Sequence, residues 1–272
     1  LRYSAEYTTF YSFKSFFNNY LVKSKKSYTP QNIGELKNDY DLFISGSDQV
    51  WSPRCVGFDP AYFLTFADDR QKYSYAASFA VPTLPDEFID EYKKRLNGFQ
   101  KFSVREPSGE KLVKELTGRT AETHLDPTLL ISADEWKKIA VSKIDKPYIL
   151  IFTANPAVSL VDFALKLSKE KNLPVYCIND APHPVSHGIN YIVAPTVEEF
   201  VGCFKNAEYV VTNSFHGTAF SVIFNKNLFV EFKNKSGRNI RSEGLLKSLG
   251  IDREIVDGNC NETEINWDII NA

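Results

Sequence analysis

Methionine is absent from all 272 residues of this chain, including position 1. Either part of the natural sequence is missing, or modified methionines are not written out. In both cases we expect the numbering to conceal gaps and an N-terminal element of the fold to be missing.

Cysteine is scarce and scattered. The four residues are Cys55, Cys177, Cys203 and Cys260, and none is paired as C-x-x-C. This spacing excludes the common zinc and redox motifs and predicts free thiols in a reducing cytoplasm.

Histidine is equally rare, and its spacing does not suit a metal ion. His183 and His187 lie four residues apart, but the prolines at 182 and 184 argue against a pair on one helix. Neither this pair nor His124 has an evident third ligand. We therefore predict no metal site, and we expect no cofactor.

The chain lacks both an excess of charge and a long apolar run. Lys and Arg number 32 against 34 Asp and Glu, so the net charge is −2, which argues against a nucleic-acid partner. No run approaches the ~20 apolar residues of a membrane span, and Leu1–Tyr11 has no apolar signal-peptide core. We expect a cytoplasmic protein, with peripheral membrane association left open, and a few placed cations still allow an anionic ligand.

Short apolar runs and amphipathic stretches alternate along the chain. The predicted strands are Tyr40–Ile44, Tyr73–Phe79, Phe102–Arg105, Tyr148–Phe152, Pro174–Ile178, Tyr191–Val193, Tyr209–Thr212 and Leu228–Phe232. The predicted helices include Phe13–Leu21, Asp86–Phe99, Ser108–Thr117, Val158–Lys171, Gly217–Phe224 and Ser242–Leu249, with another opening at Thr196. This alternation predicts an α/β fold with parallel sheets.

The alternation breaks near Lys143–Pro147, which we interpret as a linker. It divides the chain into residues 1–145 and 146–272. Both halves have the length and pattern of Rossmann-like domains.

The sharpest local feature is the stretch around His216. A buried strand ends at Thr212, a polar turn follows, and a helix begins at once. Such a helix N-terminus attracts anions, and Gly217 lets a ligand approach the backbone near the N–H groups of Gly217 and Thr218. Alternatively, His216 is a core residue that caps the turn. Loops at strand ends often carry sites, which favours the functional interpretation.

A second polar turn, Gly46–Gln49, also follows a predicted strand. Its residues Ser47, Asp48 and Gln49 suit hydrogen bonds to sugar hydroxyls, and Trp51 offers an apolar ring face. An Asx-type turn above a buried Trp explains the same pattern.

Two cationic features complete the candidate set. Arg105 follows an apolar strand, where its guanidinium suits a carboxylate or phosphate, although a surface pair with Glu106 is the simpler explanation. The basic stretch 233–241 contains Gly237 and follows the last predicted strand. It is either a solvated loop or, if it folds towards His216, one wall of an anion pocket.

The motifs in these stretches resemble the polysaccharide pyruvyl transferase family. They are YDLFISGSDQVW (40–51), YSYAASF (73–79), SVRE (103–106), LDPTL (125–129), YVVTNSFHGTAFSVIF (209–224) and NIRSEGLL (239–246). They occur in the family's order over most of the chain, and GSDQVW together with SFHGTAFS is specific.

The resemblance implies a GT-B-like architecture, in which two Rossmann-like domains face a cleft. It also implies transfer of a pyruvyl group from phosphoenolpyruvate to sugar hydroxyls, which gives a cyclic ketal and phosphate. The glycan acceptor is expected to be a surface or capsular polysaccharide precursor, linked to a lipid or a nucleotide.

The same resemblance assigns roles to residues. It makes His216 the catalytic residue of the donor-side C-terminal domain. The implied substrate-binding residues are Arg105, Ser214, Phe215, Gly217, Thr218, Lys235, Asn239, Arg241, Gly46, Ser47, Asp48 and Gln49. Lys233 is the alternative to Lys235. His216, beside anions, is expected to favour its protonated form and to act as an acid or to stabilise the departing phosphate.

Two departures from the family leave rival functions open. Some members carry Arg where this chain has Ser214, and members usually begin with a strand and an Asn/Gly-rich turn that this chain lacks. One rival is a GT-B glycosyltransferase that uses a nucleotide sugar. The other is an inactive glycan-binding protein of the same fold.

Overall fold

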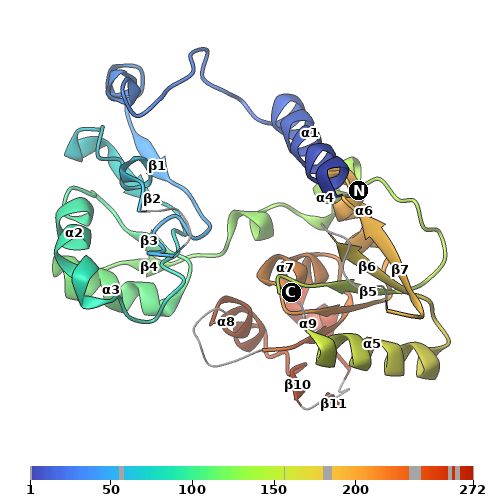
Figure 1. Ribbon diagram of the computed structural model, residues 1–272. Coiled ribbons are helices and arrows are strands. Elements are labelled where there is room, and N and C mark those ends of the chain that lie inside the picture. The colour runs from blue at the N-terminus through green and yellow to red at the C-terminus, as the bar shows by residue number, and fades with distance from the viewer. Residues whose placement is uncertain are drawn as a thin grey trace. The chain divides into compact units, whose positions relative to one another are not determined.

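The computed structural model in Figure 1 describes residues 2–54, 58–155, 157–179, 186–232, 240–256, 259–260 and 264–271. The chain divides into two units. The N-terminal unit comprises Ser24–Leu130 with Ser236–Arg241, and the C-terminal unit comprises Leu1–Lys23, Ile131–Lys235 and Ser242–Ala272. The predicted boundary at residue 145 therefore differs from the structural one.

The difference at the start of the chain comes from a contact that spacing does not show. Helix α1 (Arg2–Tyr20) belongs to the C-terminal unit, where the Ser12 hydroxyl accepts a hydrogen bond of 3.2 Å from the Val197 N–H at the start of α6 (Val197–Asn206). Helix α4 (Ala133–Ile139) also belongs there. It is capped by Ser132, which accepts from the Glu135 N–H.

The C-terminal unit contains a five-stranded sheet whose neighbouring strands all run parallel. The strands are β5 (Ile149–Phe152), β6 (Val175–Asn179), β7 (Ile189–Val193), β8 (Tyr209–Thr212) and β9 (Asn227–Val230). Their order is β7-β6-β5-β8-β9, so the chain reverses its direction across the sheet between β5 and β8. In such folds, ligands bind outside the carboxyl ends of the strands at this switch point.

Helices cover both faces of this sheet because successive strand residues point to opposite faces. Phe163 of α5 (Val158–Lys171) packs with Phe229 and with Ile151 on one face. The other face holds Phe204 of α6 and Phe220 of α7 (Phe215–Ile223). The remaining elements of this unit are α8 (Ile240–Ser248), which begins in the segment assigned to the N-terminal unit, β10 (Ile255–Val256), β11 (Asn259–Cys260) and α9 (Trp267–Asn271).

The N-terminal unit is built from short parallel strand pairs. β1 (Phe43–Ser45) pairs with β2 (Lys72–Ser74), and β3 (Ser103–Val104) pairs with β4 (Glu122–Thr123). Single parallel bridges at Tyr73–Lys101 and Ala77–Val104 connect the two pairs. Helices α2 (Asp86–Leu96) and α3 (Pro107–Thr117) and the 3₁₀ helices Ile33–Asn38, Pro60–Phe63, Asp69–Gln71 and Pro127–Leu130 complete the unit.

One expectation for this unit was wrong, and one open alternative is decided. The predicted strand Tyr73–Phe79 stops after Ser74, where Ala76 adopts a positive φ of 46° that no extended strand contains. Of the two interpretations of Trp51, the structure supports the buried one, because its side chain is fully buried among Phe63, Phe79 and other aromatic rings. Its indole N–H donates to the Tyr62 carbonyl at 3.2 Å.

Candidate functional site

The loops that follow β5 and β8 meet at the switch point of the C-terminal sheet. Asn213 joins them: its Oδ1 accepts from the Ala154 N–H at 2.8 Å, and its Nδ2 donates to the Asn155 carbonyl at 2.9 Å. Sequence reasoning passed over Asn213, although it stands in the same polar turn as His216. The structure thus places the predicted turn where α/β enzymes bind their ligands.

His216 lies in the first turn of α7, and its side chain is partly exposed. Its ring stands edge-on to that of Phe215, with the ring centroids 5.4 Å apart. Phe215 is buried, as is the N-cap residue Ser214. These contacts hold the imidazole at the carboxyl edge of the sheet while leaving part of it accessible.

The N–H groups that were predicted to attract an anion are already bonded. Ser214 caps α7: its hydroxyl accepts from the Gly217 N–H at 3.5 Å, and its carbonyl accepts from the Thr218 N–H at 2.9 Å. The Thr218 hydroxyl also donates to the Ser214 carbonyl, at 3.0 Å. Gly217 and Thr218 are therefore buried parts of the loop's framework.

Gly217 is required by packing. A Cβ at this position meets Thr212 Oγ1 at 2.3 Å, Thr212 Cβ at 3.0 Å and Phe152 Cδ1 at 3.2 Å. The close approach that the sequence predicted is thus an approach of α7 to its own sheet.

Replacing Gly217 by Ala is expected to lower the free energy of unfolding by about 1–3 kcal/mol, because the added methyl group overpacks this contact. Gly244 in α8 is a matched control, since a Cβ there meets nothing within 4 Å. Gly244→Ala should leave stability unchanged or raise it by ~0.5–1 kcal/mol. Urea unfolding of both variants measures the difference. Equal stability of the two would show that Gly217 is not needed for packing.

A buried carboxylate stands at the same edge of the sheet. Glu231 directly follows β9 and is 6% exposed. Its N–H donates to the Thr212 carbonyl at 2.9 Å, and its Oε1 accepts from the hydroxyl of Ser159 in the first turn of α5. Sequence reasoning missed this pair, and the only signal for it was a charged residue inside the apolar run 228–232.

The second predicted turn and Arg105 come together in the N-terminal unit. The Arg105 side chain is only 2% exposed. Its Nη1 donates to Asp126 Oδ2 at 2.5 Å and to Ser47 Oγ at 3.4 Å, and its Nη2 lies 3.3 Å from Asp48 Oδ1. Arg241 Nη1 lies 3.7 Å from the same Asp48 oxygen. We call Ser47, Asp48, Arg105, Asp126 and Arg241 the arginine–carboxylate cluster.

Asp126 is the buried anchor of this cluster. Burial disfavours its charged form, but the N–H and hydroxyl of Thr128 and the guanidinium of Arg105 outweigh burial and lower the pKa of Asp126. Ser47 Oγ also donates to Asp126 Oδ2 at 2.9 Å. The LDPTL motif was noted in the sequence, but its Asp126 was not identified as the partner of Arg105, because the two lie 21 residues apart.

Glu106 lies buried beside the cluster and is 3% exposed. Its Oε1 accepts from the Ser78 hydroxyl. Burial raises the pKa of Glu106, although Ser78 and the charges of Arg105 and Arg241 oppose the shift. Burial, and then the like charge of Arg105, lowers the pKa of Arg241.

Glu106→Gln is expected to change how stability depends on pH. Because the folded state holds the Glu106 proton more tightly than the unfolded chain, this group lowers stability as the pH rises above its ordinary pKa of 4.5. The advantage of the Gln variant over the native chain should therefore grow with pH, by about 1.4 kcal/mol for each tenfold difference in proton affinity. Urea unfolding at several pH values, with exposed Glu122→Gln as control, measures it. A difference that stays constant with pH would contradict the expectation.

The other predicted site residues differ in exposure, and some lie outside the described ranges. Gly46 is exposed with open space around it, and Gln49 is partly buried in the same turn. Lys233, Lys235 and Asn239 lie outside the described residues, as do His183 and Cys55. None of Cys177, Cys203 and Cys260 forms a disulfide with another described residue.

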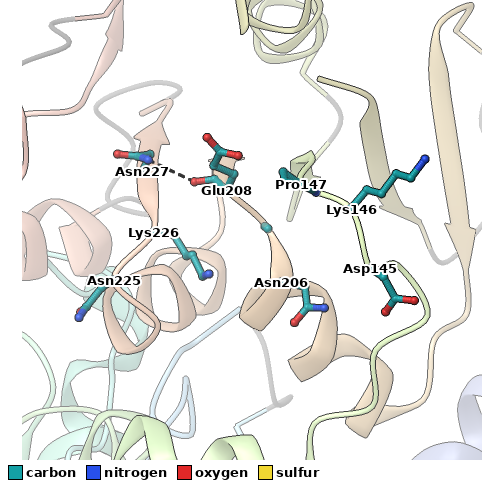
Figure 2. Close-up of a pocket in the computed structure, with 9 residues that line it drawn as sticks. Asp145, Lys146, Pro147, Asn206, Glu208, Asn225, Lys226 and Asn227 are labelled. Atoms are coloured by element: carbon teal, nitrogen blue, oxygen red, sulfur yellow. Dashed lines mark hydrogen bonds between the residues drawn. The ribbon is translucent and has the colours of Figure 1, made fainter. Parts of the chain in front are cut away.

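A cavity of about 460 Å³ in the C-terminal unit lies at the amino ends of the strands, opposite the edge that carries His216. Its lining residues Pro147, Glu208 and Lys226 stand just before β5, β8 and β9, so it opens at the amino edge of the sheet (Figure 2). Its polar side chains hold loops together. Lys226 Nζ donates to the Lys205 carbonyl at 2.7 Å, and Asn227 Nδ2 donates to the Glu208 carbonyl at 3.4 Å. We therefore do not assign this cavity to catalysis.

The described residues contain no group of three His, Cys, Asp or Glu side chains arranged to hold a metal ion. Within the same ranges, none of the helices combines the length and hydropathy that crossing a bilayer requires.

Comparison with known families decides the assignment of this chain. The family model for polysaccharide pyruvyl transferase matches residues 2–230, a range that contains His216, Asp48, Arg105 and Asp126. The chain belongs to the polysaccharide pyruvyl transferase family. It is therefore a transferase whose general reaction is pyruvyl transfer to a polysaccharide, which implies a glycan acceptor. No curated protein sequence matches this family member closely enough to count as a relative.

Solved structures show the fold of this family member. A UDP-GlcNAc 2-epimerase from Methanocaldococcus jannaschii aligns with a TM-score of 0.54 and 14% identity over 95% of this chain and 80% of the epimerase. MnaA of S. aureus, solved with UDP, aligns with a TM-score of 0.53 and 15% identity over 96% of this chain and 75% of MnaA. These likenesses show a GT-B-like α/β fold with parallel sheets, as predicted.

Proposed function

We propose that this enzyme transfers a pyruvyl group from phosphoenolpyruvate to two hydroxyls of a sugar, forming a pyruvate ketal. Membership of the pyruvyl transferase family supports the reaction class. The observation that carries the proposal is the position of His216 beside the joined loops at the switch point of the C-terminal sheet.

The reaction needs proton transfers and no redox change. The methylene carbon of the donor gains a proton and becomes a methyl group. The central carbon forms two bonds to sugar oxygens, and its bond to the phosphate oxygen breaks. Of the two protons that the hydroxyls release, one balances the proton gained by the methyl group and the other balances the released phosphate.

On the donor side, we propose His216 as the acid that protonates the methylene carbon or stabilises the departing phosphate. Ser214, Phe215, Gly217 and Thr218 shape its loop through the cap and the packing described above. Phosphoenolpyruvate carries about three negative charges near neutral pH and favours cationic partners. Lys235 and Asn239, or Lys233 in place of Lys235, are proposed to supply contacts to it.

On the acceptor side, we propose the turn Gly46–Gln49, whose Asp48 is held by Arg105 and Arg241. Hydroxyl-rich acceptors favour such a mixed set of carboxylate, amide and hydroxyl groups. The acceptor is proposed to be a lipid- or nucleotide-linked precursor of a surface polysaccharide. Because phosphoenolpyruvate is a cytoplasmic metabolite, we place the reaction in the cytoplasm, where a lipid-linked acceptor would bring the enzyme to a membrane surface.

Calorimetric titration tests the donor. Phosphoenolpyruvate should bind the full chain saturably, and His216→Ala should weaken that binding. UDP is the control ligand, because a glycosyltransferase that uses a nucleotide sugar would bind UDP. Binding of UDP with none of phosphoenolpyruvate would overturn the proposed donor.

A further inference from the structure

Three carboxylates gather around Arg105, and they differ sharply in exposure. The side chain of Asp126 is 5% exposed and Glu106 is 3% exposed, whereas the side chain of Asp48 is 67% exposed. A substrate can therefore reach Asp48 directly, while Asp126 and Glu106 are sealed by protein.

The exposed carboxylate is nevertheless held firmly. Both arginines contact its Oδ1, Arg105 through Nη2 at 3.3 Å and Arg241 through Nη1 at 3.7 Å. Within the described part of the chain, no hydrogen bond or ion pair involves its Oδ2. One oxygen of Asp48 is thus anchored, and the other is available to a ligand.

The backbone conformation also restrains Asp48. Asp48 has a positive φ of 71°, a conformation that Asp tolerates better than most side chains. Its carbonyl accepts from the Ser78 N–H at 3.0 Å, which ties the turn to the neighbouring segment. Such strain persists only where the surroundings enforce it, and it is common at functional sites.

Arg105 is in turn fixed by buried partners. Its Nη1 donates a hydrogen bond of 2.5 Å to Asp126, and the Ser47 hydroxyl is hydrogen-bonded to both Arg105 and Asp126. In this arrangement a donor phosphate would have to displace Asp48 to reach the guanidinium. This geometry therefore indicates that Arg105 acts on the substrate through Asp48 and not by direct contact.

We propose that Asp48 is the catalytic base that takes a proton from the acceptor hydroxyl, and that Arg105 is a positioning residue that aims Asp48. The inference rests on the proposed function and deepens it. As the hydroxyl oxygen bonds to the central carbon of the donor, the carbon–carbon double bond of the donor opens and its methylene carbon is protonated. The O–H bond of the acceptor breaks at the same time, and its proton passes to Oδ2 of Asp48. Asp48 then releases that proton to solvent.

The test compares kinetics with donor affinity. Phosphate release from phosphoenolpyruvate is measured with a panel of p-nitrophenyl hexosides, and donor affinity is measured separately by calorimetry. Asp48→Asn should lower kcat by ~10²–10⁴-fold, the usual contribution of a general base, and leave donor affinity unchanged. Asp90→Asn on α2, an exposed site outside the cluster, is the matched control and should keep native kcat.

Arg105→Lys separates positioning from donor binding. It keeps the charge but cannot contact Asp126 and Asp48 through a planar fork. We expect lower kcat with unchanged affinity for phosphoenolpyruvate, after thermal unfolding has confirmed a folded variant. If donor affinity falls as far as in His216→Ala, Arg105 contacts the donor, and its positioning role is overturned.

The remaining outcomes are distinguishable. If the native chain turns over and Asp48→Asn turns over equally, the base assignment alone is wrong. If the native chain releases no phosphate with any acceptor, the proposed function fails and this inference falls with it.

Discussion

Replacing His216 by Ala is expected to slow pyruvyl transfer by ~10²–10⁴-fold, the range typical for loss of a general acid. His216 stands in the α7 turn at the switch point, and the Ser214 cap and the Asn213 bridge fix that turn. Phosphate release at saturating phosphoenolpyruvate and acceptor measures the loss. The variant should unfold at close to the native temperature, because the ring is partly exposed.

His187→Ala is the matched control, since His187 is exposed and lies in the same unit. It should keep native activity. A His216→Ala variant that retains native kcat would remove His216 from catalysis and leave it as a structural residue of the loop. A loss of both kcat and folding would instead assign it to stability.

Breaking the Arg105–Asp126 pair is expected to cost about 3–5 kcal/mol of folding free energy, as for other buried ion pairs that lose one partner. Arg105→Met leaves the Asp126 carboxylate buried without the guanidinium that helps to keep it ionised. Asp126→Leu leaves the buried guanidinium without its shortest contact. The double variant should be more stable than the sum of the two single losses predicts, because neither charge is then stranded.

Urea unfolding at neutral pH measures this cycle. Lys137→Met is the control: its pair with Asp134 is exposed, and its loss should cost at most ~1 kcal/mol. Single losses near that control value would show that the buried pair contributes little. Additive losses in the double variant would show that Arg105 and Asp126 are not coupled.

The lowered pKa of Asp126 also fixes the sign of a pH effect. The folded state holds this proton less tightly than the unfolded chain, so the group stabilises the fold above its ordinary pKa of 3.8. That contribution disappears as the pH falls through the lower folded value. It is opposite in sign to the contribution of Glu106.

Local features of the candidate site were predictable from the sequence. The apolar run 209–212, the polar turn and the small residues after it indicated a strand, a loop and a helix, and they form β8, the His216 loop and α7. The order of strands and helices also indicated a parallel α/β fold. These features are set by residues that are close together in the sequence, and the hydrophobic periodicity of such residues predicts helices and strands.

Long-range pairings could not be predicted in the same way. Ser47 and Asp126 are 79 residues apart and share a hydrogen bond, while Ser159 and Glu231 are separated by 72 residues. Spacing carries no signal for such pairs. The same limit explains why α1 was assigned to the first half of the chain, and why the sequence left both a sugar-facing and a buried Trp51 open.

Product analysis tests the central claim most directly. Native enzyme, phosphoenolpyruvate and a p-nitrophenyl hexoside panel are incubated together, and acceptor mass and phosphate are measured on the same sample. Pyruvyl transfer predicts an acceptor that has gained one ketal-linked pyruvyl group, with one phosphate released for each. Phosphate release with no acceptor modified, or acceptor modified only when a nucleotide sugar is supplied, would contradict it.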